Sequence, residues 1–358
     1  MPVAGLDRGF TYTGLPARVV FGSGTLASVK AEVERLGIAR ALVLTTPAQT
    51  AHGRDLIDRL GDRAAGMFSG AAMHTPIDVT TAALELVRAV DADGVVAIGG
   101  GSTIGLGKAI AVRTKLPQLA IPTTYAGSEM TPILGETEGG QKTTRSSPEI
   151  LPETVIYDVE LTLSLPATLS GTSGINAIAH AVEALYARDT NPIAQVMAEQ
   201  AIAALAHALP AIAADAGDRA ARREALYGAW LCGVCLGTVG MALHHKLCHV
   251  VGGAFQMPHA ETHTVILPHA VAYNAAAAPE AMARVARALG VGDAAGGLYD
   301  LAGAVGAARS LAALGMPADG LDRAADLAVA NPYWNPRPLE RAAIRELLGR
   351  AHAGARPA

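Results

Sequence analysis

The chain has 358 residues, which is long for one compact core and predicts two domains of ordinary size. Lysine and arginine together number 28 against 32 aspartate and glutamate residues, a formal net charge of -4. This balance provides no basic surface for nucleic acid or for an anionic membrane. A small-molecule ligand is therefore the default expectation.

Cysteine usage indicates a reducing compartment. The three cysteines are too few and too clustered for a disulfide framework, so we expect a cytoplasmic protein. Cys232 and Cys235 form a C-x-x-C pair, but they lie in an apolar helical run without a second pair, which favours a core role over a redox or zinc role. The first residues lack the pattern of a signal peptide. The sequence contains no uncharged apolar span of about 18 residues, so a membrane helix is not predicted.

The first 160 residues alternate short β-branched runs with amphipathic helical patterns. Such alternation predicts parallel strands joined by crossover helices that cover both faces of one sheet. This architecture is typical of nucleotide-binding domains. The expected strands are residues 18–21, 41–45, 94–98 and 118–121, and the expected helices are residues 24–36, 53–60, 76–90 and 102–114.

From residue 161 onward the strand signal disappears, and apolar positions recur at three- and four-residue intervals. This periodicity predicts an all-helical bundle. We therefore expect one domain over residues 1–160 and a second over residues 161–358, with the boundary near residues 157–162. The longer expected helices are residues 164–186, 192–214, 219–238, 242–255 and 258–273.

A glycine-rich loop follows the expected strand at residues 94–98. It begins with three consecutive glycines, continues through Ser102 and Thr103, and opens directly into a helix. Backbone amides without side chains at a helix N-terminus form a cradle for pyrophosphate. The loop does not match the G-x-G-x-x-G fingerprint, so a tight turn without a ligand remains the alternative.

A second loop with small hydroxyl residues, 122–129, follows the next expected strand. Neighbouring parallel strands that both end in such loops line one crevice at the carboxyl edge of the sheet, where ligands of open α/β folds bind. After the strand at residues 41–44, the sequence Thr-Thr-Pro lacks the acidic residue that usually contacts the ribose of NAD, so we expect NADPH to be accepted beside NADH. The cofactor-binding candidates are Thr45, Gly99, Gly100, Gly101, Ser102, Thr103, Thr123, Thr124, Ser128 and Lys142.

Histidines concentrate in the helical half. His244, His245 and His249 fall within six residues of an otherwise apolar helix, beside Lys246. Burying so many ionisable groups without a function is costly, which favours a functional site. Solvent-exposed positions are expected instead for His52, His74, His207 and His352, and both interpretations stay open for His263 and His269.

Four blocks of the sequence, in the correct order and spanning nearly the whole chain, resemble the iron-containing alcohol dehydrogenase family. They are GGGSTIGLGK at residues 99–108, PTTYAGSEMT at 122–131, GINAIAHAVEA at 174–184 and LHHKLCHVVGGAFQMPHAETHTVILPH at 243–269. The resemblance implies a dehydroquinate-synthase-like fold, in which an α/β dinucleotide-binding domain and an all-helical catalytic domain flank a catalytic cleft. It further implies NADH or NADPH as cofactor and a homodimer.

The metal-dependent members of that family hold a divalent ion with one aspartate and three histidines. The matching positions here are Asn176, His180, His245 and His259. An amide oxygen is a poorer, uncharged ligand, so we expect no metal at this site. Three imidazoles can still hold zinc, and these four residues are the expected ligands if an ion binds.

Within the family, the blocks resemble members that reduce maleylacetate to 3-oxoadipate with NADH or NADPH in the degradation of aromatic compounds. Hydride addition to the alkene carbon remote from the ketone places negative charge on the carbonyl oxygen, which needs hydrogen-bond donors or positive charge. We expect His245 and His249 to supply protons and His180, His259 and Asn176 to complete a cationic pocket. The candidates for binding the dicarboxylate substrate are Lys246, His244, Tyr125 and Arg145.

Two alternative functions remain open at this point. One is a metal-dependent alcohol dehydrogenase, with iron or zinc, acting on simple alcohols. The other is a non-catalytic nucleotide-binding protein in which Asn176 marks a decayed site. Neither alternative involves nucleic acid or a membrane as a partner.

Overall fold

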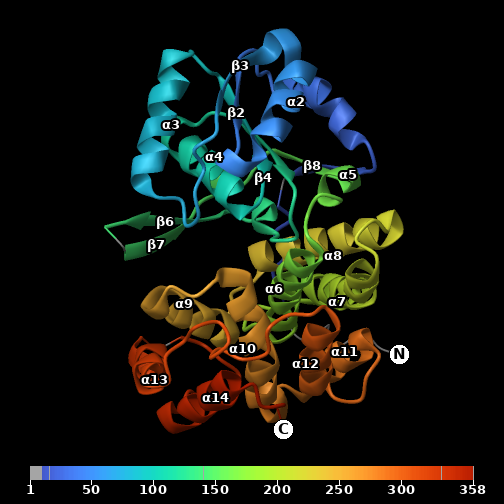
Figure 1. Cartoon of the computed structure of the whole chain (residues 1–358), viewed down its shortest axis with the longest axis vertical. Coiled ribbons are helices and arrows are strands. Elements are labelled where there is room, and N and C mark those ends of the chain that lie inside the picture. Colours follow the sequence, from blue (N-terminus) through green and yellow to red (C-terminus); the bar gives the residue numbers. More distant parts are fainter. Residues whose placement is uncertain (1–9, 16, 140, 332, 358) are drawn as a thin grey trace. The chain divides into compact units, whose positions relative to one another are not determined.

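The computed structural model describes residues 10–15, 17–139, 141–331 and 333–357, and for Lys142 it describes the backbone alone. The chain divides into two compact units. One is Gly14–Leu165, and the other contains the chain from Pro166 onward together with residues 10–13. The first unit holds all the strands of Figure 1, and the second is helical.

Six strands of the first unit form one parallel sheet in the order β1-β8-β5-β4-β2-β3. The central strands are buried along their whole length. Continuous apolar runs are typical of parallel strands whose two faces are both covered, so the structure confirms the predicted α/β architecture. The strands are β1 (Arg18–Gly22), β2 (Ala41–Leu44), β3 (Ala64–Phe68), β4 (Gly94–Gly99), β5 (Gln118–Pro122) and β8 (Thr154–Asp158).

Alternate residues of the central strands face two separate cores. Val43 and Val96 pack on the side of the first two helices, whereas Leu42 and Val95 pack on the side of the next two. This alternation follows from the two-residue period of a strand and places helices on both faces of the sheet (Figure 1). The helices are α1 (Val29–Arg35), α2 (Thr50–Leu60), α3 (Ile77–Ala89), α4 (Gly101–Thr114) and the short α5 (Val159–Thr162).

Four strands lie outside the set predicted from the sequence. Two of them, β3 and β8, belong to the parallel sheet. The other two form an antiparallel hairpin, β6 (Ile133–Glu138) with β7 (Gln141–Ser146), where no strand was predicted. The hairpin is anchored by ion pairs from Arg113 and Arg145 to the buried Glu136.

The second unit is built from helices, as predicted. Helices α6, α7 and α8 pack against one another, and α10 contacts α6, α9, α12 and α14. Apolar residues of α9, α10, α13 and α14 share one core. The helices are α6 (Ala167–Tyr186), α7 (Pro192–Ala214), α8 (Arg219–Thr238), α9 (Leu243–Phe255), α10 (His259–Asn274), α11 (Pro279–Leu289), α12 (Ala294–Ala304), α13 (Gly320–Ala330) and α14 (Arg341–Ala353).

By length and hydropathy alone, α7 is able to cross a membrane, and the strongly bent pair α8 and α9 passes the same test together. In the structure α7 packs between neighbours of the bundle and carries Glu199, which pairs with Arg284 and Arg287 of α11. These are the surroundings of a core helix, which is apolar because it is buried by other helices.

Candidate active site

The predicted nucleotide-binding loop lies between β4 and α4. Gly100 precedes the helix without any side-chain cap, so the first amides of α4 remain available to a ligand. Gly99 has φ 154, and a Cβ there would meet Thr103 Oγ1 at 2.4 Å and Gln49 Oε1 at 2.8 Å. Only glycine fits this backbone position. The loop therefore provides a bare backbone surface that suits a pyrophosphate.

The ends of three neighbouring strands converge at this loop. Gln49, just after β2, donates through Nε2 to Thr123 Oγ1 after β5 at 2.9 Å. A Cβ on Gly100 would lie 3.0 Å from the Thr124 side chain. The convergence of β2, β4 and β5 is that of a ligand crevice at the carboxyl edge of a sheet. Gln49 was not predicted, because glutamine in a helical turn carries no recognisable signal.

The cofactor-binding candidates separate by exposure into two groups. Gly100, Gly101, Ser102, Thr124 and Ser128 are at least partly accessible to a ligand. The other described candidates, Gly99, Thr103, Thr123 and Thr45, are buried and shape the crevice from beneath.

For Thr45 this burial is a correction. Its side chain is fully buried and the Oγ1 atom has no partner among the described groups, whereas the neighbouring Thr46 is partly exposed. The side chain of Lys142 lies outside the described part of the chain.

A buried lysine fixes the second loop. Lys108 of α4 donates through Nζ to the carbonyl oxygens of Ser128 and Ile133 and to Thr131 Oγ1. Burial lowers the pKa of Lys108 to about 7, although the charge of Glu129 opposes this shift. Lys108 is the last residue of the GGGSTIGLGK block, and no role was predicted for it. Its contacts indicate that it positions the loop at residues 128–133.

The predicted histidines of the helical unit form one cluster of rings on α6, α9 and α10. His245 is at its centre. Its ring stacks on His180 at 5.0 Å and meets His244 at 5.2 Å, His263 at 5.1 Å and His249 at 6.4 Å between centroids. His259 joins through its contact with His263 at 4.4 Å. The structure thus brings together the catalytic histidines that the sequence predicted.

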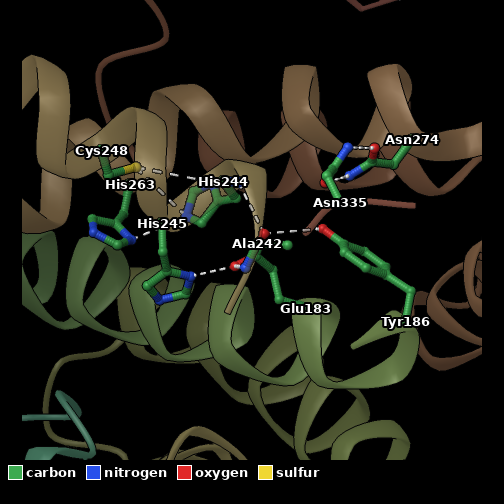
Figure 2. Close-up of polar contacts among 9 residues, drawn as sticks. All are labelled: Glu183, Tyr186, Ala242, His244, His245, Cys248, His263, Asn274 and Asn335. Atoms are coloured by element: carbon green, nitrogen blue, oxygen red, sulfur yellow. Dashed lines mark hydrogen bonds and ion pairs between the residues drawn. The ribbon is translucent and has the colours of Figure 1, made fainter. Parts of the chain in front are cut away.

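Glu183 organises the start of α9, as Figure 2 shows. This fully buried carboxylate accepts hydrogen bonds from the backbone N of Ala242 and of His244, both at 2.9 Å. It also lies 2.7 Å from Nδ1 of His245 and accepts a hydrogen bond from the Tyr186 hydroxyl. Since a carboxylate only accepts, Nδ1 carries the hydrogen and Nε2 is free for other chemistry.

Glu183 was not predicted from the sequence, although an acidic residue on a helix as apolar as α6 was a usable signal. Its position three residues after His180 was also informative, because residues three apart lie on the same face of a helix.

Three of the four positions matching the metal ligands of the family present unsatisfied atoms. Asn176 Oδ1, His180 Nδ1 and His245 Nε2 are all buried and lack a partner among the described groups. The donor set is nevertheless a poor fit to a divalent ion, because it contains no carboxylate and because His180, His245 and His259 do not converge on one point. Among described residues, the one trio of histidine, cysteine or carboxylate side chains with ligand atoms within 4.8 Å of each other is elsewhere.

Electrostatics correct one expectation about this cluster. Burial holds the pKa of His180 well below its usual range, and the neighbouring His245, His259 and His249 lower it further. His180 is therefore a neutral ring in the ligand-free protein and not the cationic group that the sequence analysis expected. In contrast, His249 and His259 lie at the exposed side of the cluster.

The substrate-binding candidates are also separated by the structure. Lys246 is half-buried on α9, with Nζ 5.7 Å from the centre of the Tyr333 ring, and is placed to meet an anion. His244 and Tyr125 are fully buried, so their predicted contact with substrate is not supported. Arg145 is already paired with Glu136 at 2.7 Å on the β6–β7 hairpin of the other unit.

Comparison with known proteins agrees with this geometry. Residues 16–159 match the model of the iron-containing alcohol dehydrogenase family, and residues 170–352 match the C-terminal model of the same family. A maleylacetate reductase of Rhizobium sp. strain MTP-10005 is 60% identical over 97% of this chain and 99% of its own.

Solved structures give the same answer. The crystal structure of maleylacetate reductase from Agrobacterium tumefaciens superposes with a TM-score of 0.95 at 60% identity, covering 98% of this chain and 100% of the other. An iron-containing alcohol dehydrogenase from Corynebacterium glutamicum superposes with a TM-score of 0.94 at 42% identity, covering 98% of each chain. Because both family models and near full-length relatives match, the chain belongs to the iron-containing alcohol dehydrogenase family.

Proposed function

We propose that this protein is a maleylacetate reductase, which converts maleylacetate to 3-oxoadipate with NADH or NADPH. The observation that carries the proposal is the 60% identity to a maleylacetate reductase over 97% of the chain. The histidine cluster with Asn176 in place of a carboxylate supports it, because the reaction can proceed by protonation without a Lewis acid. We assign dinucleotide binding to residues 1–160 and catalysis to residues 161–358.

The reaction requires a proton and stabilisation of a transient enolate. When bound, the reduced nicotinamide supplies a hydride to the alkene carbon remote from the ketone. The electron pair of the double bond then moves toward the carbonyl oxygen, and the carbon next to the ketone takes up a proton to give the saturated product. The chain must therefore hold the carbonyl with donors and deliver one proton.

His245 is the residue best placed to manage that charge. Glu183 accepts its Nδ1 hydrogen at 2.7 Å and fixes the ring, so Nε2 is the atom that exchanges a proton with the substrate or donates to the enolate oxygen. His249 lies next to it at the exposed side of the cluster and is the second proton donor that we propose. His180, His259 and Asn176 complete the polar lining.

The substrate also carries two carboxylates. We assign one of them to Lys246, which follows His245 on α9, is half-buried and supplies a positive charge. The assignment of Arg145 to the second requires it to exchange the Glu136 carboxylate for that of the substrate. We further propose a cytoplasmic homodimer, on the basis of family resemblance.

A direct assay tests the function. Purified protein is expected to consume NADH or NADPH in the presence of maleylacetate, followed at the nicotinamide absorbance band, with 3-oxoadipate as product. Turnover should survive dialysis against a chelator, because Asn176 replaces the carboxylate that would help His180, His245 and His259 to hold a divalent ion. Oxidation of simple alcohols that depends on added iron or zinc, without turnover of maleylacetate, would support the metal-dependent alcohol dehydrogenase instead.

Cofactor preference provides a second prediction, at the end of β2. Thr46→Asp places a carboxylate at the half-exposed position beside Gln49, where it would repel a 2′-phosphate. We expect kcat/KM for NADPH to fall roughly 10- to 100-fold relative to NADH. Thr46→Asn is the matched control, because asparagine has the shape of aspartate without its charge. Equal losses with both cofactors in Thr46→Asp would mean that this residue does not face the ribose.

A further inference from the structure

We propose that His244, Cys248 and His263 form a binding site for a zinc-like divalent ion, separate from the four positions of the family's metal site. These three side chains project from α9 and α10 toward one point (Figure 2), and their ligand atoms all lie within 4.8 Å of one another. All three residues are buried.

The spacing of the ligand atoms agrees with tetrahedral coordination. His244 Nε2 lies 3.0 Å from His263 Nδ1 and 3.7 Å from Cys248 Sγ. Zinc bonds of about 2.0 Å to nitrogen and about 2.3 Å to sulfur place two nitrogens about 3.3 Å apart and a nitrogen and a sulfur about 3.5 Å apart. The trio therefore needs only small side-chain movements to close around an ion.

The ligand atoms of the three side chains already face one another. One hydrogen bond joins His244 Nε2 to His263 Nδ1, and Cys248 Sγ contacts the same nitrogen of His244. Binding of an ion would release one proton, because the Cys248 thiol becomes a thiolate.

The ligand types select the class of metal. One thiolate and two imidazoles favour zinc or a similarly soft ion over magnesium, calcium or manganese, which prefer oxygen. Such an ion would lie directly behind His245, whose ring contacts those of His244 and His263. It would add positive charge next to the proposed proton donor. The inference does not depend on which substrate is reduced.

Cobalt(II) provides a spectroscopic test, because a cobalt–thiolate bond gives a charge-transfer band that imidazole or carboxylate ligands do not give. We expect the wild-type protein to bind about one cobalt ion per chain with this band, as for a single three-ligand site. Cys248→Ser should remove the band and weaken binding at least about tenfold. Cys235→Ser, a buried thiol on α8 that bonds to Ala194 O, is the matched control and should keep both.

Two further results separate this site from its rivals. Asn176→Ala should leave the band unchanged, because the amide belongs to the other set of positions. X-ray absorption of the zinc-loaded wild-type protein should show one sulfur per zinc, a measurement that stands even if Cys248→Ser does not fold. Two sulfurs per zinc would place the ion at Cys232 and Cys235 and would overturn the proposal. A cobalt–thiolate band that is retained in Cys248→Ser, or a wild-type protein that binds no cobalt, would also overturn it.

Discussion

Replacing His245 with alanine lowers kcat by about a hundredfold or more, the usual scale for losing a proton donor or a donor to a developing oxyanion. The loss should appear mainly in kcat, with a small change in KM, because the ring is needed chiefly when charge moves to the carbonyl oxygen. His249→Ala is expected to show a loss of similar size. Steady-state kinetics with maleylacetate at saturating NADH measure both effects.

The control for these variants is another histidine of the same unit. His207 is exposed on α7, where Nδ1 pairs with Glu224 at 2.7 Å, so His207→Ala should retain the wild-type kcat. Full activity in His245→Ala would remove this residue from the mechanism. Wild-type kcat in His249→Ala alone would leave His245 as the single proton donor.

Glu183→Gln is expected to damage both stability and catalysis. The carboxylate accepts two backbone hydrogen bonds at the start of α9 and a third from His245, all inside the protein. The glutamine side chain places an N–H donor opposite a group that also donates. Two facing donors leave a buried hydrogen bond unmade, which lowers the free energy of unfolding by about 2–4 kcal/mol. Turnover should fall roughly tenfold or more, because His245 loses the group that fixes its ring and its tautomer.

A double mutant separates these two effects. In a His245→Ala background, Glu183→Gln should still reduce stability in a urea titration but should cause little additional loss of kcat, since its catalytic role acts through that ring. Independent, multiplying losses of kcat in the double mutant would contradict a positioning role. Glu183→Asp, which keeps the charge on a shorter side chain, tests how much depends on charge alone.

Much of the fold was predictable because local signals agree with the tertiary structure. The bounds of α7 and α8 match the prediction residue for residue, and each helix begins with a clear cap. Asn191 accepts from Ala194 N just before Pro192, and Asp218 accepts from the first amides of α8. The strands missed at the edge and in the hairpin are either rich in alanine and glycine or polar, so composition gave no indication of pairing.

The site residues that lie in sequence blocks resembling a family were predictable. The residues whose roles depend on contacts in the folded protein were not. The positions of His180, His245, His249 and His259 followed from their sequence blocks, whereas the predicted substrate contact of His244 is not supported, because its ring is fully buried. Gln49, Lys108 and Glu183 each act through partners far away in the chain. Their roles depend on packing across elements, and no periodicity in a single sequence reports such contacts.

One carboxylate, Glu183, both caps α9 and holds the ring of His245. Evolution of a new substrate range in this scaffold is therefore constrained at that residue, because a change that retunes the chemistry also weakens the helix. Variation should instead accumulate at half-exposed neighbours such as Lys246, which is not tied to the cap. An engineer seeking altered specificity has the same reason to begin library design there and to leave residue 183 fixed.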